Sequence, residues 1–179
     1  MDATVNVGSS PSPARWKRGL ARVDGWVVKV ETIAGIALVI AILVAVLAQV
    51  VMRYVFESPN PWTEELSRFA FIWLSFIGAS LATRNRAHFA LDSAVAYLSP
   101  RMRLVVARAV ELVLAALLIG VLVFGAALAN DARVERSPAL DLPMMWVYVA
   151  MPISAALMLL HLIAGATAVE ERGSFWPSR

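Results

Sequence analysis

Residues 32–52 read TIAGIALVIAILVAVLAQVVM, a run of 21 residues without a formal charge. Three more uncharged runs follow, with lengths of 15, 19 and 28 residues: 69–83, 112–130 and 142–169. A helix needs about 20 mostly apolar residues to cross the hydrocarbon core of a bilayer, and the shortest run reaches this length if its helix begins near Pro61. The sequence therefore predicts an all-α protein with one four-helix membrane domain at 32–169, its spans lying at about 32–54, 61–83, 104–129 and 142–169.

The composition of the whole chain agrees with a membrane protein. The 179 residues are 60% hydrophobic and 16% charged, with a mean hydropathy of +0.71. Soluble domains average roughly 45–50% apolar and about 25% charged residues. The chain has no cysteine, which excludes disulfides, iron–sulfur clusters and cysteine nucleophiles. Its net charge of +3 is explained first by orientation in the membrane, and we expect no nucleic acid partner.

The positions of Lys and Arg predict how the chain lies in the membrane. Of the 16 basic residues, 12 fall on one side: in the N-terminal segment, in the second connection with the start of the third span, and in the C-terminal tail. The other side has four: Arg53, Arg68, Arg133 and Arg136. Positively charged loops are retained in the cytoplasm. We therefore expect a multi-pass protein of the bacterial inner membrane with both termini in the cytoplasm, including a tail at 170–179.

The residues before the first span divide into two parts. Residues 1–13 are polar and rich in Ser and Pro, and we expect a disordered tail. Over 14–31, apolar residues recur at steps of three and four beside a basic stripe, which predicts an amphipathic helix in the cytoplasmic interface; a solvated, partly frayed lead-in is the alternative. About 30 residues precede the first apolar run, which favours a retained anchor over a cleaved signal peptide.

Small residues and prolines predict local features of the spans. Pro152 lies inside the fourth span and predicts a kink there. Between the second and third spans, an apolar face over 91–98 that ends before Pro100 predicts a second short interfacial helix. A stripe of small side chains on the first span predicts a packing face for a neighbouring helix: Ala37, Ala41, Ala45 and Ala48.

Residues 59–68, PNPWTEELSR, carry the most informative group of polar side chains. Asn60 can cap a helix that begins at Pro61, because the first helical turn does not need the missing N–H of proline. Glu64 and Glu65 then lie in the first turns, where the helix dipole favours negative charge, and Arg68 is within reach of either for an ion pair. Two interpretations stay open: local capping with an ion pair, or a surface that docks a partner.

Several features of a transporter or an enzyme are missing from the sequence. No charged residue lies in the middle of a predicted span, and no span shows the interrupted pattern that forms substrate sites at the midplane. The only two histidines, His88 and His161, form no paired ligand motif for haem. We expect His161 to bond a neighbouring helix, and His88 and Asp92 to form at most a structural hydrogen bond. We expect no cofactor, no metal and no enzymatic activity.

An ordered set of motifs resembles the small membrane subunit of tripartite ATP-independent periplasmic (TRAP) transporters, the DctQ-like family. The set begins with RYVF at 53–56 and PWTEE at 61–65 and ends with LSP at 98–100. Between these motifs lie single residues in the same order and spacing as in the family: Trp73, Gly78, Ala79, Arg84, His88 and Asp92.

The resemblance implies a role that the residues alone do not show. It implies a scaffold subunit of a sodium-coupled importer of organic acids, working with a large DctM-like elevator-type permease, a DctP-like periplasmic binding protein and membrane lipids. The candidate structural or partner-contact residues are then Arg53, Trp62, Glu64, Glu65, Arg68, Trp73, His88 and Asp92.

The function, the substrate and the stoichiometry stay open. We expect a separate polypeptide. The alternative to the scaffold function is an autonomous homo-oligomeric four-span transporter or channel, and a haem-carrying redox subunit is a third possible function. The substrate and the stoichiometry cannot be predicted from one chain, because the resemblance implies that other subunits recognise the substrate.

Overall fold

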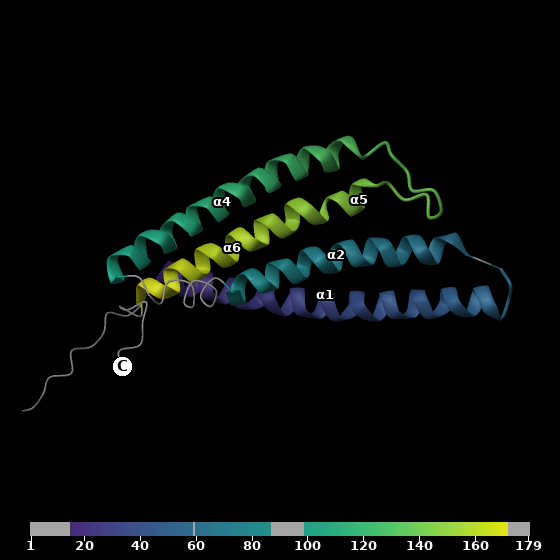
Figure 1. Ribbon diagram of the computed structural model, residues 1–179, viewed down its shortest axis with the longest axis horizontal. Coiled ribbons are helices and arrows are strands. Elements are labelled where there is room, and N and C mark those ends of the chain that lie inside the picture. The colour runs from purple at the N-terminus through teal and green to yellow at the C-terminus, as the bar shows by residue number, and fades with distance from the viewer. Residues whose placement is uncertain (1–14, 59, 87–98, 172–179) are drawn as a thin grey trace, which may run out of the picture.

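A computed structural model describes residues 15–58, 60–86 and 99–171 (Figure 1). In these three ranges every regular element is a helix, apart from one isolated bridge between Arg136 and Pro143. The helices are α1 (Arg15–Tyr54), α2 (Pro61–Arg86), α4 (Pro100–Asp131), α5 (Met145–Tyr148) and α6 (Ala150–Glu171). The predicted tail at 1–13, residues 172–179 of the predicted tail at 170–179, and the short interfacial helix predicted over 91–98 lie outside the described residues, while residues 170–171 belong to α6.

Four stretches of the described helices are long and apolar enough to cross a membrane. They coincide with the four predicted spans, so the all-α membrane fold is confirmed. The largest difference in extent is at the first span, which begins ten residues before its predicted start. The four stretches are Arg22–Tyr54, Pro61–Arg84, Val105–Asp131 and Met145–Gly165.

The long helices run side by side along the length of the molecule (Figure 1). α1 packs against α2, and α6 packs against α1, α2 and α4, so α6 joins the two halves of the bundle. We call the end where α1 and α4 begin the terminal end. The opposite end, which carries the connections at 55–60 and 132–144, is the loop end.

The first helix differs from the arrangement that the sequence predicts. Residues 15–31 do not form a separate element but continue without a break into the first span, giving one helix of 40 residues. Two acidic side chains in this extension, Asp24 and Glu31, are buried, because α6 covers them. The position of this extension in the membrane interface stays a prediction.

Small residues form much of the interior. Ala45, Ala129 and Ala150 are buried, and a methyl group added at Gly125 would lie 3.0 Å from Met151 Sδ. Such residues let helix backbones approach closely where lipid supplies no hydrophobic drive for association. Of the predicted stripe on the first span, Ala45 is buried within the chain, whereas Ala37 and Ala41 are exposed. The role of those two residues as a packing face therefore stays a prediction.

The fourth span is interrupted near its proline, as predicted. α5 ends at Tyr148 and α6 begins at Ala150, with Val149 between them. Pro152 has no N–H to donate to the carbonyl of Tyr148, so the regular bonding pattern fails at this turn. The interruption places the short helix α5 against α2 and α4 at the loop end.

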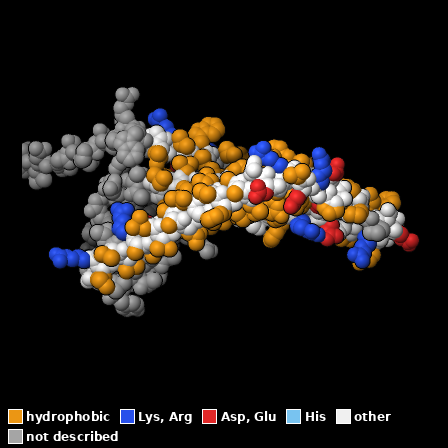
Figure 2. Space-filling model, turned by 90° about the horizontal axis from the view of Figure 1, so that it is seen from above, with side chains coloured by type: hydrophobic (Ala, Val, Ile, Leu, Met, Phe, Trp, Pro, Cys, Tyr) orange, Lys and Arg blue, Asp and Glu red, His pale blue; other side chains and the backbone are white. Residues whose placement is uncertain are grey.

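Apolar side chains cover most of the outer surface. Figure 2 shows them along the length of one face, with the acidic side chains of that face gathered towards the loop end. Only 6% of the most apolar window of α1 is buried within the chain. These faces therefore suit contact with lipid or with another membrane protein.

Candidate functional site

Glu65 anchors the long connection at the loop end. Its carboxylate Oε2 accepts hydrogen bonds from the backbone N–H groups of Ala139 (2.9 Å) and Leu140 (2.8 Å), and the residue is buried. Hydrogen bonds to a charged acceptor are stronger than neutral ones. The N-terminal part of α2 is thereby tied to a loop that follows 74 residues later.

The loop that Glu65 holds is also braced within itself. The Leu142 N–H donates to Ser137 Oγ (3.2 Å), and the Ser137 N–H donates to the Leu142 carbonyl (2.9 Å). Arg136 Nη1 donates to the carbonyl of Asp141 (2.9 Å), a residue with φ of 52° at the turn. These bonds give the connection at 132–144 a defined shape, and the bond to Glu65 fixes it on the bundle.

The start of α2 follows the predicted pattern. The helix begins at Pro61, and the fully buried Thr63 hydroxyl donates to the carbonyl of Asn60 at 2.8 Å. Glu64 and Arg68 form an exposed ion pair at 2.9 Å. The sequence allowed Arg68 to pair with either Glu64 or Glu65. In the structure Arg68 bonds Glu64, while Glu65 points inward to the loop.

The other predicted site residues have separate places. Trp73 Nε1 donates to the carbonyl of Trp146 at 3.0 Å and so connects α2 to α5. Trp62 and Arg53 are exposed and form no hydrogen bond or ion pair within the described ranges. His88 and Asp92 lie outside the residues that the structure describes.

A second polar cluster, which the sequence did not predict, lies at the terminal end. The His161 side chain is completely buried, with Nδ1 2.5 Å from Asp24 Oδ1 and Nε2 2.9 Å from Glu31 Oε2. Arg84 Nε donates to Asp24 Oδ2 at 3.0 Å. We call these four residues the histidine cluster; they join α1, α2 and α6. The prediction that His161 bonds a neighbouring helix is confirmed.

The geometry of α1 explains how both acids reach one imidazole. Asp24 and Glu31 are seven residues apart, which is close to two helical turns, so they lie on the same face. The sequence signal was present: Asp24 and Glu31 interrupt the apolar face at 14–31 at this spacing. That face was read from its apolar and basic residues, and the two acids within it were not considered.

The histidine cluster is a buried set of side-chain contacts between helices. The two carboxylates lie at opposite nitrogens of the ring and do not converge on one point, and no group of three or more His, Cys, Asp or Glu in the described part of the chain is arranged to hold a metal. Glu31 Oε1 is buried without a hydrogen-bond partner there. The arrangement holds helices together and offers no open reaction site.

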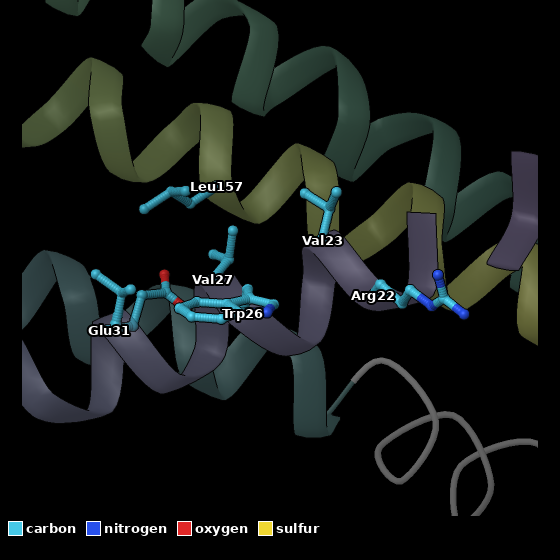
Figure 3. Close-up of a pocket in the computed structure, with 7 residues that line it drawn as sticks. Arg22, Val23, Trp26, Val27, Glu31 and Leu157 are labelled. Carbon is cyan, nitrogen blue, oxygen red and sulfur yellow. The ribbon is translucent and has the colours of Figure 1, made fainter. Parts of the chain in front are cut away.

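An apolar groove of about 380 Å³ lies beside the histidine cluster, between α1 and α6. Figure 3 shows Leu157 of α6 across from Val27 of α1, with Glu31 near one end of the groove and Arg22 at the other. The residues that line it are Arg22, Val23, Trp26, Val27, Val30, Glu31 and Leu157. The groove is open, and five of these seven lining side chains are apolar.

The described structure can be compared with known proteins. The model of the DctQ component of tripartite ATP-independent periplasmic transporters matches residues 42–170. The sialic acid TRAP transporter permease protein SiaT of Haemophilus influenzae is 30% identical over 139 residues, which are 78% of this chain and 23% of SiaT. The isethionate TRAP transporter permease protein DctMQ of Oleidesulfovibrio alaskensis is 32% identical over 104 residues, which are 57% of this chain and 16% of DctMQ.

A relative of similar size is also a TRAP transporter protein. The sialic acid TRAP transporter small permease protein SiaQ of Vibrio cholerae is 22% identical over 129 residues, which cover 72% of this chain and 75% of SiaQ. The chain thus spans a minor part of SiaT and DctMQ but most of SiaQ. The family match runs from the second half of α1 to the end of α6 and includes Glu65, Trp73 and His161. The chain belongs to the DctQ family of TRAP transporter components, as its ordered motifs predicted.

Proposed function

We propose that this protein is the non-catalytic small membrane subunit of a TRAP transporter that imports an organic acid in a sodium-coupled process. In this role it supports a large DctM-like permease and adds surface for a DctP-like binding protein. The observation that carries the proposal is the family match over 42–170, which includes the last part of the first span and the whole of the other three.

The placement of charge supports a scaffold role. Of the buried charged groups described here, Glu65 lies at the loop end and the histidine cluster lies in the half of the bundle towards the terminal end; its innermost acid, Glu31, is nine residues inside the stretch Arg22–Tyr54, whose midpoint is Leu38. Ionisable groups at the bilayer midplane usually mark substrate or ion pathways. We therefore assign substrate and sodium binding to the large permease.

The relatives support a large membrane partner. The matching segment makes up 23% of SiaT and 16% of DctMQ, so most of each of those permeases corresponds to nothing in this chain. The exposed apolar faces of α1 and α4 offer area for such a partner: Val39, Leu43 and Leu47 on α1 and Val113, Leu117 and Phe124 on α4 are all exposed.

The loop end is the candidate surface for the binding protein. The exposed pairs Glu64–Arg68 and Arg136–Asp141 project from elements that Glu65 fixes in place. The excess of Lys and Arg at the terminal end supports an inner-membrane location with cytoplasmic termini. In this proposed orientation the loop end faces the periplasm. Exposed charges on a rigid support favour rapid, specific encounter with a soluble partner.

The names of the relatives support the substrate class. Sialic acid and isethionate are both organic acids, and they are the substrates named for SiaT, SiaQ and DctMQ. We propose an organic acid for this system as well. The choice of acid belongs to the other subunits.

Co-purification tests the proposed role. A tagged form of this chain, co-expressed with its cognate large permease, should retain the permease through detergent extraction and size-exclusion chromatography. A variant with Leu43 and Leu47 both changed to Asn tests the α1 face, and a variant with Val113 and Leu117 both changed to Asn tests the α4 face; loss of the permease is expected where the substituted face contacts it. Isolation of homo-oligomers that never retain the permease would overturn the proposal and favour the autonomous transporter.

A further inference from the structure

The His161 ring faces a carboxylate oxygen at each of its two nitrogens. Nδ1 lies 2.5 Å from Asp24 Oδ1, and Nε2 lies 2.9 Å from Glu31 Oε2. A neutral imidazole has one N–H donor and one lone pair, so it can donate to only one of them. The imidazolium form donates from both nitrogens. The observed arrangement therefore requires one more proton than a neutral ring and two carboxylates carry.

We propose that the histidine cluster is a proton-binding site, in which His161 holds that proton as an imidazolium and thereby clasps α1 to α6. With the proton, the charges of His161 and Arg84 balance those of Asp24 and Glu31. Without it, the cluster carries one uncompensated negative charge in a site where the imidazole is fully buried. Burial of an unpaired charge is strongly unfavourable.

Charged groups of the neighbouring helices do not change this balance. On α4, Arg108 is paired with Glu111 at 3.0 Å, and α5 contains no Asp, Glu, Lys, Arg or His. Arg22 and Lys29 of α1 are exposed. Among the described side chains, Asp24 and Glu31 of α1 and Arg84 of α2 are therefore the charged groups that contact the ring.

Glu31 depends on the proton more than Asp24 does. Asp24 keeps its bond from Arg84 whether or not the ring is charged. Glu31 is 3% exposed, and its Oε2 is bonded only by His161, while Oε1 has no partner in the described part of the chain. Loss of the proton therefore leaves the Glu31 carboxylate with the poorest compensation. The contact between α1 and α6 beside Glu31 is the part that should loosen.

Water at the terminal end can supply and accept the proton. The side chain of Arg84 is 39% exposed and that of Asp24 is 10% exposed, so the cluster reaches the surface on the Arg84 side. Protonation forms one N–H bond on the ring with a proton taken from water, and release returns it to water. No other reactant is needed.

Nitrogen-15 NMR of the full chain in nanodiscs tests the charge of His161 directly. The chain has two histidines, so His88→Gln in the background leaves one ring signal. At about neutral pH we expect the two protonated nitrogens of an imidazolium. Glu31→Gln should remove this signal, because an amide N–H can donate to the Nε2 lone pair of a neutral ring. Glu111→Gln, in the exposed pair of α4, is the control and should leave it unchanged.

The same experiment can overturn the proposal. A neutral His161 ring at about pH 6 in the otherwise unchanged chain would show that the cluster does not hold the proton on the imidazole. An imidazolium signal that persists equally in Glu31→Gln would show that Glu31 is not what retains it.

The clasp is tested by the separation of α1 and α6. The chain lacks cysteine, so Val27→Cys with Leu157→Cys gives two spin labels across the groove. Raising the pH from about 6 to about 9 should broaden and lengthen the distance distribution in the otherwise unchanged chain and in the Glu111→Gln control, but not in Glu31→Gln. A distribution that is independent of pH in the unchanged chain would contradict the clasp.

Discussion

Glu65 at the loop end and Glu31 at the terminal end are both buried, but their partners differ. Backbone N–H groups of Ala139 and Leu140 bind Glu65, and these donors exist at any pH. A side-chain ring binds Glu31, and that ring donates from both nitrogens only when it is protonated. The hydrogen bonds at the loop end therefore keep their donors at every pH, while those at the terminal end depend on protonation of His161. On this account the contacts between helices change with pH at the terminal end only.

The largest effect is expected from loss of the ring that joins the two acids. His161→Gln can donate to one carboxylate but presents its carbonyl to the other. Because breaking a buried ionic contact leaves an uncompensated charge, the free energy of unfolding should fall by about 3 kcal/mol. Denaturant unfolding in detergent micelles measures it. Glu111→Gln, in the partly exposed pair with Arg108, should change stability by about 0.5 kcal/mol at most. Equal effects of the two variants would contradict a special role for the ring.

Removal of the Glu65 carboxylate should lower the free energy of unfolding somewhat less than loss of the His161 ring. Glu65→Ala leaves two backbone N–H groups of the loop without their acceptor, and we expect a loss of about 1–3 kcal/mol in the free energy of unfolding. Glu65→Gln keeps one carbonyl acceptor and should lie between Ala and the natural residue. The adjacent Glu64→Ala is the matched control, since its pair with Arg68 is exposed. Proteolysis of the connection at 132–144 should accelerate in Glu65→Ala only. Resistance equal to that of the unchanged chain would refute the anchoring role.

The bond between Trp73 and Trp146 predicts a smaller effect. Trp73→Phe keeps an aromatic ring but removes the N–H that donates to the Trp146 carbonyl. The expected destabilisation is about 1 kcal/mol, typical of a single neutral hydrogen bond. Trp62→Phe, at an exposed ring without such a bond in the described ranges, provides the comparison. Thermal unfolding that does not separate the two variants would argue against the bond.

The exposed pair should matter least for stability. Arg68→Glu replaces an attraction with a repulsion at the surface, and solvent screening limits the loss to about 1 kcal/mol or less. If the loop end docks the binding protein, this variant should still lower uptake by the assembled system. Normal uptake would instead return Glu64 and Arg68 to helix capping, the first of the two interpretations that the sequence left open.

Local sequence patterns predicted the spans well because each span is a property of consecutive residues. The uncharged runs located all four, and Asn60 and Pro61 located the start of α2. The same counting starts the first span at 32, because it treats Glu31 as an end signal, whereas the apolar stretch of α1 begins at Arg22. In the folded chain, Glu31 contacts His161, which lies 130 residues away.

The candidate site was harder to predict because its bonds are long-range. Glu65 and Arg68 are among the candidate residues that the sequence indicates, but local spacing could not show that Glu65 bonds a loop 74 residues later. No role was predicted for Asp24, because its partners, Arg84 and His161, lie on other helices and not in neighbouring turns of α1. Arg84 belonged to the family motifs, yet its contact with Asp24 became visible only when α1 and α2 were placed together.

Sodium-driven uptake by reconstituted liposomes tests the scaffold role most directly. Three preparations are compared, each with the matching binding protein and a radiolabelled organic acid: this chain with the large permease, the permease alone and this chain alone. The scaffold role predicts uptake only when both membrane subunits are present. Uptake by this chain alone would contradict it, since that would require a substrate pathway within these four helices.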